Sequence, residues 1–578
     1  MEEHVPLSDQ NASVQDALRL CASAGDEERF VGLVLTARVL PFHAQPDALL
    51  RRALDSCGFV FAERMLRTPP DSGASAHALR PLALKLLAQR ARAGSLGTRR
   101  GPQLAALALD AFDAETRGGR KRGADAPREA APDDTAAEAA TDGLQLACAL
   151  ASDSAYASDI LRVAAASPTL AALLAPPLEA ERVDGACALV GALCHGLRAY
   201  EQHGAHAGAR NVAHTAELAD AMHSVARALT RAAGSAASAR AEPCAPHGDP
   251  LCFRLVSALS QWFELPAALW ACGDAPRDAP TPVAVATGLP DLPPAHWLGS
   301  LRCLLGRHLA TRLPPRARAE ALGLCSAALG LFGCAWVVVQ PGDEPLGAPS
   351  ASARAPPPAM DAGAAGARGE AEKAQMAPMA AGTLANLMVQ LSAVELAMAL
   401  RTGGEGDGAH ARAPSTAHST ELHDDDDDDG LRQRVRAVLA CATIVETCLV
   451  ELHADVADGD SDGGADADAS PADRPRWAHA FDDASLLAIH RAVLGVVETA
   501  AQFAEDLREQ ARGARERAAH PLAPVAARLL AVWLVQPSAP HSTELHARVR
   551  NVAESLVTAA SGGDGGATPW AAALATSV

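Results

Sequence analysis

The sequence predicts an all-α fold, on three observations. Only 3% of the 578 residues are aromatic and Tyr occurs twice, so there is little from which to build sheets. Ala, Leu and Val supply most of the apolar content and recur at the three- and four-residue intervals of amphipathic helices. The chain is also longer than one compact core, which stops growing near ~250–300 residues. Together these features predict an armadillo- or HEAT-like α-solenoid with disordered insertions.

The block from Ser13 to Thr68 reads as four short helices, and the other helices are expected to follow its pattern. The first has a single apolar stripe, which is formed by Val14, Ala17, Leu18 and Cys21. Ser13 and Asp16 have the spacing of a capping box at its start, and Gly25 is expected to close it.

The second helix of this block carries apolar residues on nearly all its faces. They are Phe30, Val31, Leu33, Val34, Leu35, Ala37 and Val39. We therefore expect this helix to be covered from more than one side. The third begins at Pro46, exposes Arg51 and Arg52, buries Leu50, Ala53, Leu54 and Cys57, and stops at Gly58. Such helices cannot bury themselves alone, so they indicate stacking on neighbours.

Composition divides the chain into five parts. A tail at 1–12 precedes the N-terminal part of the solenoid at 13–340, which contains a flexible insertion at 117–142 that lacks an apolar stripe. A disordered linker rich in Ala, Gly and Pro follows at 341–378. The C-terminal part of the solenoid is predicted at 379–559, with acidic loops at 402–430 and 455–476, and a Gly-rich tail at 560–578.

Several segments resemble the neurochondrin family of cytosolic armadillo-like proteins. The clearest is Gly58-Phe59-x-Phe61-x-x-Arg64-x-Leu66, which resembles the N-terminal region of that family. The segments 292–336, 384–400 and 529–534 resemble later parts of it in the same order. The resemblance implies a cytosolic adaptor, linked in animals to neurite outgrowth and to restraint of calmodulin-dependent kinase signalling.

Charge and cysteine content bound the environment and the partners. The net charge of −19 argues against general nucleic-acid binding, because phosphate contacts need an excess of Lys and Arg. Thirteen cysteines without a C-x-x-C pair are typical of free, buried thiols in a reducing compartment. The acidic, polar start MEEHVPLSDQ is unlike a secretory signal, and no uninterrupted apolar run reaches the ~18–20 residues of a membrane span. We expect a cytoplasmic chain without a membrane span.

No metal, cofactor or catalytic site is predicted. The stretch from Asp458 to Gly463 begins like an EF-hand loop, but Ala469 stands where a bidentate Glu is needed. The group Cys194, His195, His203 and His206 lacks the ordered spacing of zinc ligands. P-loop, G-x-S-x-G and kinase signatures are absent from the sequence.

Three functional hypotheses follow. The preferred one is a non-enzymatic scaffold or adaptor that binds protein partners through the solenoid surface, using exposed charged positions such as Arg51, Arg52, Glu63 and Arg64. The alternative is a nucleocytoplasmic transport or RNP-assembly adaptor on the same solenoid. It would use the acidic loops and the only compact basic cluster, which comprises Arg117, Arg120, Lys121 and Arg122 and otherwise reads as a solvated loop. The third is a hydrolase or transferase without a recognisable motif. The sequence does not identify the partners, the repeat number or the oligomeric state.

Overall fold

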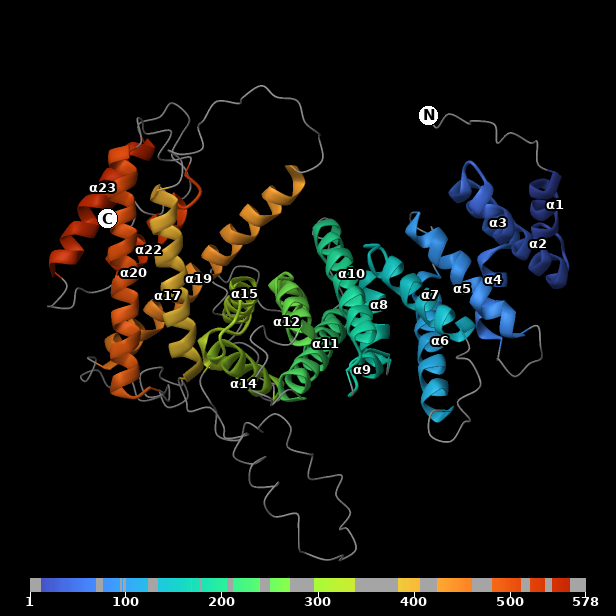
Figure 1. Cartoon of the computed structure of the whole chain (residues 1–578), viewed down its shortest axis with the longest axis horizontal. Coiled ribbons are helices and arrows are strands. Elements are labelled where there is room, and N and C mark those ends of the chain that lie inside the picture. The colour runs from blue at the N-terminus through green and yellow to red at the C-terminus, as the bar shows by residue number, and fades with distance from the viewer. Residues whose placement is uncertain are drawn as a thin grey trace, which may run out of the picture. The chain divides into compact units, whose positions relative to one another are not determined.

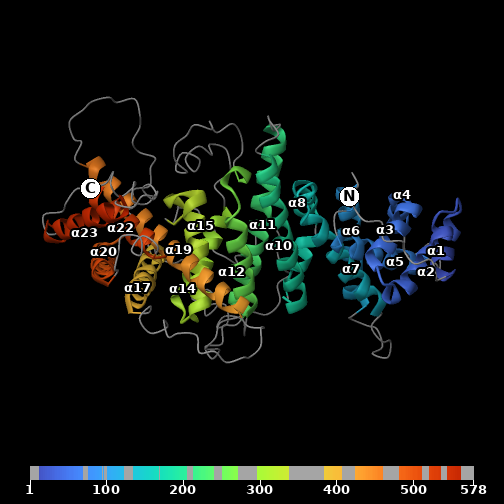
Figure 2. The ribbon, with the colours of Figure 1, turned by 90° about the horizontal axis from the view of Figure 1, so that it is seen from above.

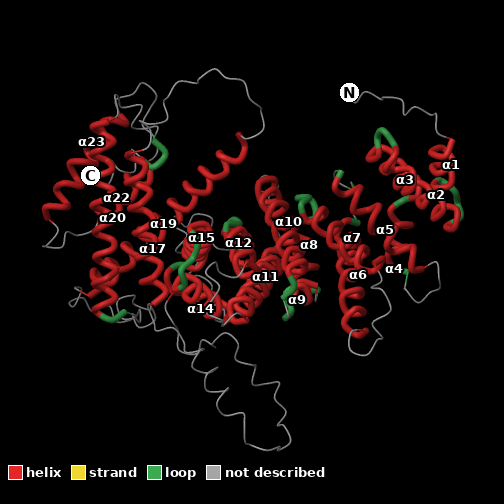
Figure 3. The backbone as a smooth tube through the Cα atoms, viewed as in Figure 1, coloured by secondary structure: helices red, strands yellow, loops and turns green. Residues whose placement is uncertain are grey.

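The computed structural model describes most of the predicted helical segments. These residues are 12–68, 76–93, 96, 100–122, 134–167, 169–176, 178–204, 212–239, 250–270, 296–337, 383–405, 424–459, 481–510, 520–535 and 543–561. Within these ranges every regular element is a helix and none is a strand (Figure 3). The all-α prediction is therefore confirmed for this part of the chain. The chain divides into two compact units, unit 1 (Met1–Ala232 and Glu264–Pro276) and unit 2 (Ala233–Phe263 and Arg277–Val578).

Unit 1 is a succession of helices whose contacts are mostly with elements one to three places away along the chain (Figure 1). Its elements are α1 (Ala12–Cys21), α2 (Asp26–Val39), η1 (Leu40–Phe42), α3 (Pro46–Cys57), α4 (Phe59–Arg67), α5 (Ala76–Arg92), α6 (Gly101–Arg122), α7 (Asp134–Ala151), α8 (Ala157–Ala166), α9 (Thr169–Leu173), α10 (Ala180–Gly204), the part of α11 (Val212–Ala239) up to Ala232, and η3 (Ala267–Leu269). Helix α1 packs on α2, α3 on α4, α4 on α5, and α7 on α5, α6 and α10. Within unit 1, Figure 2 shows α1 and α2 together at the N-terminal end of this succession.

Helix α3 forms where its sequence predicts. Pro46 occupies the first turn, where a missing backbone N–H costs nothing. The four apolar residues expected to point inward are buried, and Arg51 and Arg52 are exposed. Gly58 ends the helix with φ of +79°, a backbone conformation that residues with a Cβ rarely adopt.

One expectation for the first helices is wrong, and a second holds in part. Helix α1 already begins at Ala12, so Ser13 lies inside its first turn and is not the N-cap residue. Helix α2 packs on α1, α3, α5 and η1 and is therefore covered from more than one side, but its fully buried residues are Gly32, Leu33 and Thr36, and Val31 is 46% exposed. Helix α1 comes so close that a Cβ on Gly32 would lie 2.6 Å from the backbone nitrogen of Cys21.

Helices take up parts of the predicted insertions. Helix α6 runs on to Arg122 and α7 starts at Asp134, so both ends of the expected flexible insertion at 117–142 are helical. Helix α19 (Asp424–Gly459) starts inside the expected acidic loop at 402–430 and ends inside the one at 455–476. Six aspartates open α19, and Asp is a favourable residue type there because the helix N-terminus carries positive partial charge. The predicted linker at 341–378 and the residues 1–11 and 562–578 of the predicted tails lie outside the described residues.

Unit 2 shows the same kind of neighbour-to-neighbour packing. Its further elements are α12 (Pro250–Phe263), α14 (His296–Ala310), α15 (Pro315–Phe332), η4 (Cys334–Val337), α17 (Thr383–Glu405), α20 (Asp483–Gln510), α22 (Ala523–Val535) and α23 (Thr543–Ser561). Helix α12 packs on α15, α15 on α19, α17 on α14, α19 and α20, and α22 on α19, α20 and α23. Helices α14 and α15, from before the predicted linker, thus share one core with helices from after it.

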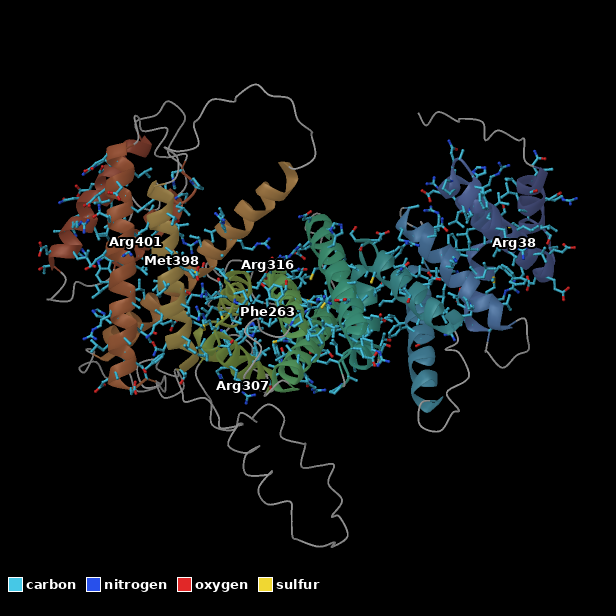
Figure 4. The ribbon with its side chains drawn as sticks, in the orientation of Figure 1. Arg38, Phe263, Arg307, Arg316, Met398 and Arg401 are labelled. Carbon is cyan, nitrogen blue, oxygen red and sulfur yellow. The ribbon has the colours of Figure 1, made fainter. Side chains whose placement is uncertain are left out.

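An aromatic cluster anchors the first half of unit 2. The ring of Phe263 lies edge-on to those of Trp297 and Phe332, with centroids 6.0 and 5.7 Å apart. Edge-on aromatic pairs contribute roughly 0.5–1.5 kcal/mol beyond the burial of their surface. This cluster joins α12, α14 and α15, and Figure 4 labels Phe263 within it.

Two helices are long and apolar enough to cross a membrane by length and composition alone. They cover Thr383–Thr402 in α17 and Asp483–Glu509 in α20. In unit 2 the two helices pack against each other, and Glu395 of α17 forms an ion pair with Arg318 of α15. Of the apolar window in each helix, 44% is buried in α17 and 33% in α20, and the expectation that the chain lacks a membrane span stays a prediction.

Candidate docking surfaces

Glu63, which the sequence places among the exposed charges, is buried at the centre of an ion-pair network. Glu63 is 5% exposed, and its two carboxylate oxygens form ion pairs with Arg67 and Arg100. A carboxylate in this position needs such partners, because removing an unpaired charge from water is very unfavourable. The expectation that Glu63 faces a binding partner is therefore wrong, and its role is to join α4 to the segment that precedes α6.

Arg64 holds α4 against α2. Its Nη2 donates a hydrogen bond of 2.9 Å to Asp26 Oδ1. The guanidinium carbons of Arg29 and Arg64 lie 6.0 and 5.8 Å from the centroid of the Phe61 ring, within the range of cation–π attraction. Phe61 is one of the motif residues that resemble the neurochondrin family, so that motif serves packing at this point.

Arg51, Arg52 and Arg64 are exposed, as the sequence predicts, and their contact with a partner stays a prediction. Of these three, Arg51 and Arg52 belong to α3. Both project from the exposed face of α3, opposite its buried residues. The basic cluster from Arg117 to Arg122 falls in the last turns of α6, and the positions of its side chains lie outside the described residues.

Sequence reasoning missed the large apolar side chains that remain exposed. In unit 1 they are Val31, Phe42 and Val60, and in unit 2 they are Val394, Met398, Leu439, Val450, Leu487 and Val535. Most lie on helices that are apolar on more than one face. An apolar pattern on all faces of a helix predicts burial of all its faces, although it is equally compatible with a second, uncovered apolar face.

The most concentrated uncovered patch in unit 2 lies on α17, and we call Val394, Met398 and Arg401 the α17 patch. Val394 is 54% and Met398 46% exposed, and they lie one turn apart on the same side of the helix. Arg401 follows on the next turn, where Figure 4 labels it beside Met398. The opposite side of α17 is buried, including Ser392 and Leu396. The patch therefore combines an adaptable apolar side chain with a cation, as protein interfaces often do.

Burial favours the uncharged forms of two histidines and two cysteines. Burial lowers the pKa of His223 and of His308 below the usual histidine value. The Nδ1 atom of His308 lies 3.9 Å from the Cys252 thiol. Burial raises the pKa of Cys148 and of Cys194 to about 12, so neither is a thiolate at neutral pH. This environment favours packing over nucleophilic chemistry.

The residues considered as metal ligands do not come together in the described part of the chain. Cys194 is buried, whereas its neighbour His195 is exposed. The side chain of His203, and the whole of His206, lie outside the described residues, as does the EF-hand-like stretch beyond Gly459. Within the ranges that the structure describes, no group of three or more His, Cys, Asp or Glu residues could hold a metal ion.

Comparison of the chain with protein-family models, with curated proteins and with solved structures finds no match.

Proposed function

We propose that this chain is a non-enzymatic, neurochondrin-like cytosolic scaffold, an armadillo- or HEAT-like α-solenoid whose exposed helix faces bind protein partners in a regulatory, signalling role. The packing of most helices against elements within three places of them along the chain supports the solenoid, because a stack of this kind is held together mainly by contacts between neighbouring repeats. The resemblance to neurochondrin, carried by Gly58 to Leu66 and by the later segments, supports the adaptor role.

The single observation that carries the proposal is the α17 patch. Val394 and Met398 are half-exposed apolar residues on a helix whose other side is already buried in the core. Folding of unit 2 leaves them in water, and a protein partner would remove them from it. A partner that fits would present apolar side chains to Val394 and Met398, and a carboxylate to Arg401.

The test compares Met398→Glu with the matched control Leu487→Glu. Both positions are on helices of unit 2 and are similarly exposed, at 46% and 48%. Full-length tagged chains would be purified from cytosol and the bound proteins quantified by mass spectrometry, after far-UV circular dichroism has shown equal helix content.

We expect Met398→Glu to reduce a defined subset of partners roughly tenfold, as for loss of an interface hot spot, and Leu487→Glu to leave that subset unchanged. Equal loss from both variants would contradict the assignment to α17. Failure of the native chain to enrich any protein over an unrelated Ala-rich control would contradict the scaffold itself.

A further inference from the structure

The outward face of α2 in unit 1 carries a short stripe with unusual symmetry. Glu27, Val31, Val34 and Arg38 follow one another at intervals of four, three and four residues, the spacing of a helix–helix seam. Glu27, Val31 and Arg38 are exposed, and Val34 is half-buried. We call these four residues the α2 stripe.

Helix α2 is covered only on the other side. It packs on α1, α3, α5 and η1, and its buried residues are Gly32, Leu33 and Thr36. Just beyond its end, Phe42 of η1 is 89% exposed. Stacked helical proteins usually place polar residues on the outer face of their first helices. The stripe departs from this rule.

The stripe is complementary to itself when one copy is turned by a two-fold axis. In an antiparallel pair centred between Val31 and Val34, each Val31 lies opposite Val34 of the second copy, and each Glu27 lies opposite Arg38 of the second copy. The two residue numbers in each facing pair, 27 with 38 and 31 with 34, add to the same total. This is the condition for an isologous contact.

The end charges are available for such a contact. In the part of the chain that the structure describes, neither Glu27 nor Arg38 forms an ion pair, whereas the neighbouring Asp26 is paired with Arg29 and Arg64. Figure 4 labels Arg38 among the N-terminal helices of unit 1. The charge pattern also selects the antiparallel arrangement, because a parallel pair in register would place Glu27 against Glu27 and Arg38 against Arg38.

We propose that a second copy of this chain docks on the α2 stripe, forming an antiparallel, two-fold symmetric dimer through α2. The inference is independent of the proposed scaffold function, since it requires no other protein. Helix α2 has 14 residues and is therefore about 21 Å long. An interface of this length falls below the roughly 1,200 Å² of a standard stable complex, so the dimer is weak and depends on concentration.

Sedimentation equilibrium of the full-length chain over a wide concentration range tests the proposal. The native chain should self-associate, less strongly at high salt. Glu27→Arg and Arg38→Glu each turn two attractive contacts into repulsive ones, so each should raise the dimer dissociation constant roughly tenfold or more. The double variant Glu27→Arg/Arg38→Glu restores both pairs and should regain association. An equimolar mixture of the two single variants should also associate, because each supplies the charges that the other lacks.

Arg52→Glu on the exposed face of α3 is the matched control, since it changes net charge as Arg38→Glu does and lies off the stripe. All three positions are exposed, and far-UV circular dichroism would show that the variants keep their helix content. A native chain that stays monomeric throughout would overturn the proposal. So would a double variant as weak as the single ones, or an equal effect of Arg52→Glu.

Discussion

Two glycines on the same helix should respond in opposite ways to replacement by alanine. In unit 1 a Cβ placed on Gly196 of α10 would lie 2.1 Å from the carbonyl oxygen of Ala151 at the end of α7, and 2.8 Å from the Cβ of Ala157 in α8. On Gly191, one and a half turns earlier, a Cβ would meet nothing within 4 Å. The pair separates the packing effect from the backbone effect of the same substitution.

The magnitudes follow from two terms. Alanine is more favourable than glycine inside a helix by about 1 kcal/mol, so Gly191→Ala should raise the free energy of unfolding by roughly 0.5–1 kcal/mol. At Gly196 the same gain is opposed by overpacking, which typically costs 1–3 kcal/mol. The upper end applies because the nearest atom belongs to the backbone and cannot rotate away. Gly196→Ala should therefore lower the free energy of unfolding by about 2 kcal/mol.

Urea denaturation followed by far-UV circular dichroism would measure the two changes. Hydrogen exchange measured by mass spectrometry would show which helices are destabilised. In Gly196→Ala, faster exchange should be concentrated in α7, α8 and α10. If Gly196→Ala proved as stable as Gly191→Ala, α10 would not approach the end of α7 as closely as the structure shows, and the packing of this part of unit 1 would have to be revised.

Three further outcomes are expected. Glu63→Ala should lower the free energy of unfolding by roughly 1–2 kcal/mol, because the ion pairs of the buried carboxylate are lost while Arg67 and Arg100, which are about half exposed, stay solvated. Arg64→Ala should cost less than about 1 kcal/mol, because its ion pair with Asp26 is exposed; a larger loss for Arg64→Ala than for Glu63→Ala in urea denaturation would contradict the buried network. Burial lowers the folded-state pKa of His308, so mainly the unfolded chain takes up a proton there as pH falls below about 6.5, and stability is lost on acidification. His308→Leu should weaken the pH dependence of the melting temperature between about pH 5 and 7.5, while His223 keeps its own share of it. An unchanged pH profile would refute this. Cys148 and Cys194 should react with an aromatic disulfide reagent at neutral pH only after denaturation, and rapid labelling of either in the native chain, identified by peptide mapping, would show that its thiol is not held protonated by burial.

The sequence predicts α3 well because local signals decide its limits. Pro46 favours a helix start and Gly58 a helix end. A single apolar stripe places Leu50 and Leu54 on the buried face and leaves Arg51 on the exposed one. Each of these signals acts within a few residues, and none depends on what the rest of the chain does.

Burial of charged residues could not be predicted in this way, because it depends on partners far along the chain. Glu63 looks like any surface carboxylate on α4 until Arg100, which lies 37 residues away, is placed beside it. Glu446 of α19 is similarly buried, with Arg528 of α22 as its partner. Helical periodicity assigns a residue to a face, but only tertiary packing decides whether that face meets water.

The exposed apolar faces of α2 and α17 combine a local pattern that the sequence shows with an exposure that only tertiary packing decides. Each helix is apolar on more than one side, and the core uses one of those sides, through Leu33 in α2 and Leu396 in α17. Val31 and Met398 therefore do not contribute to the stability of the folded chain in the way that their residue types suggest. Replacing either by a charged residue should leave folding nearly unchanged while altering association, because a half-exposed apolar side chain gains most of its burial only when a second surface covers it. For these two helices, separating effects on folding from effects on association is the most direct way to distinguish a docking face from an uncovered part of the core.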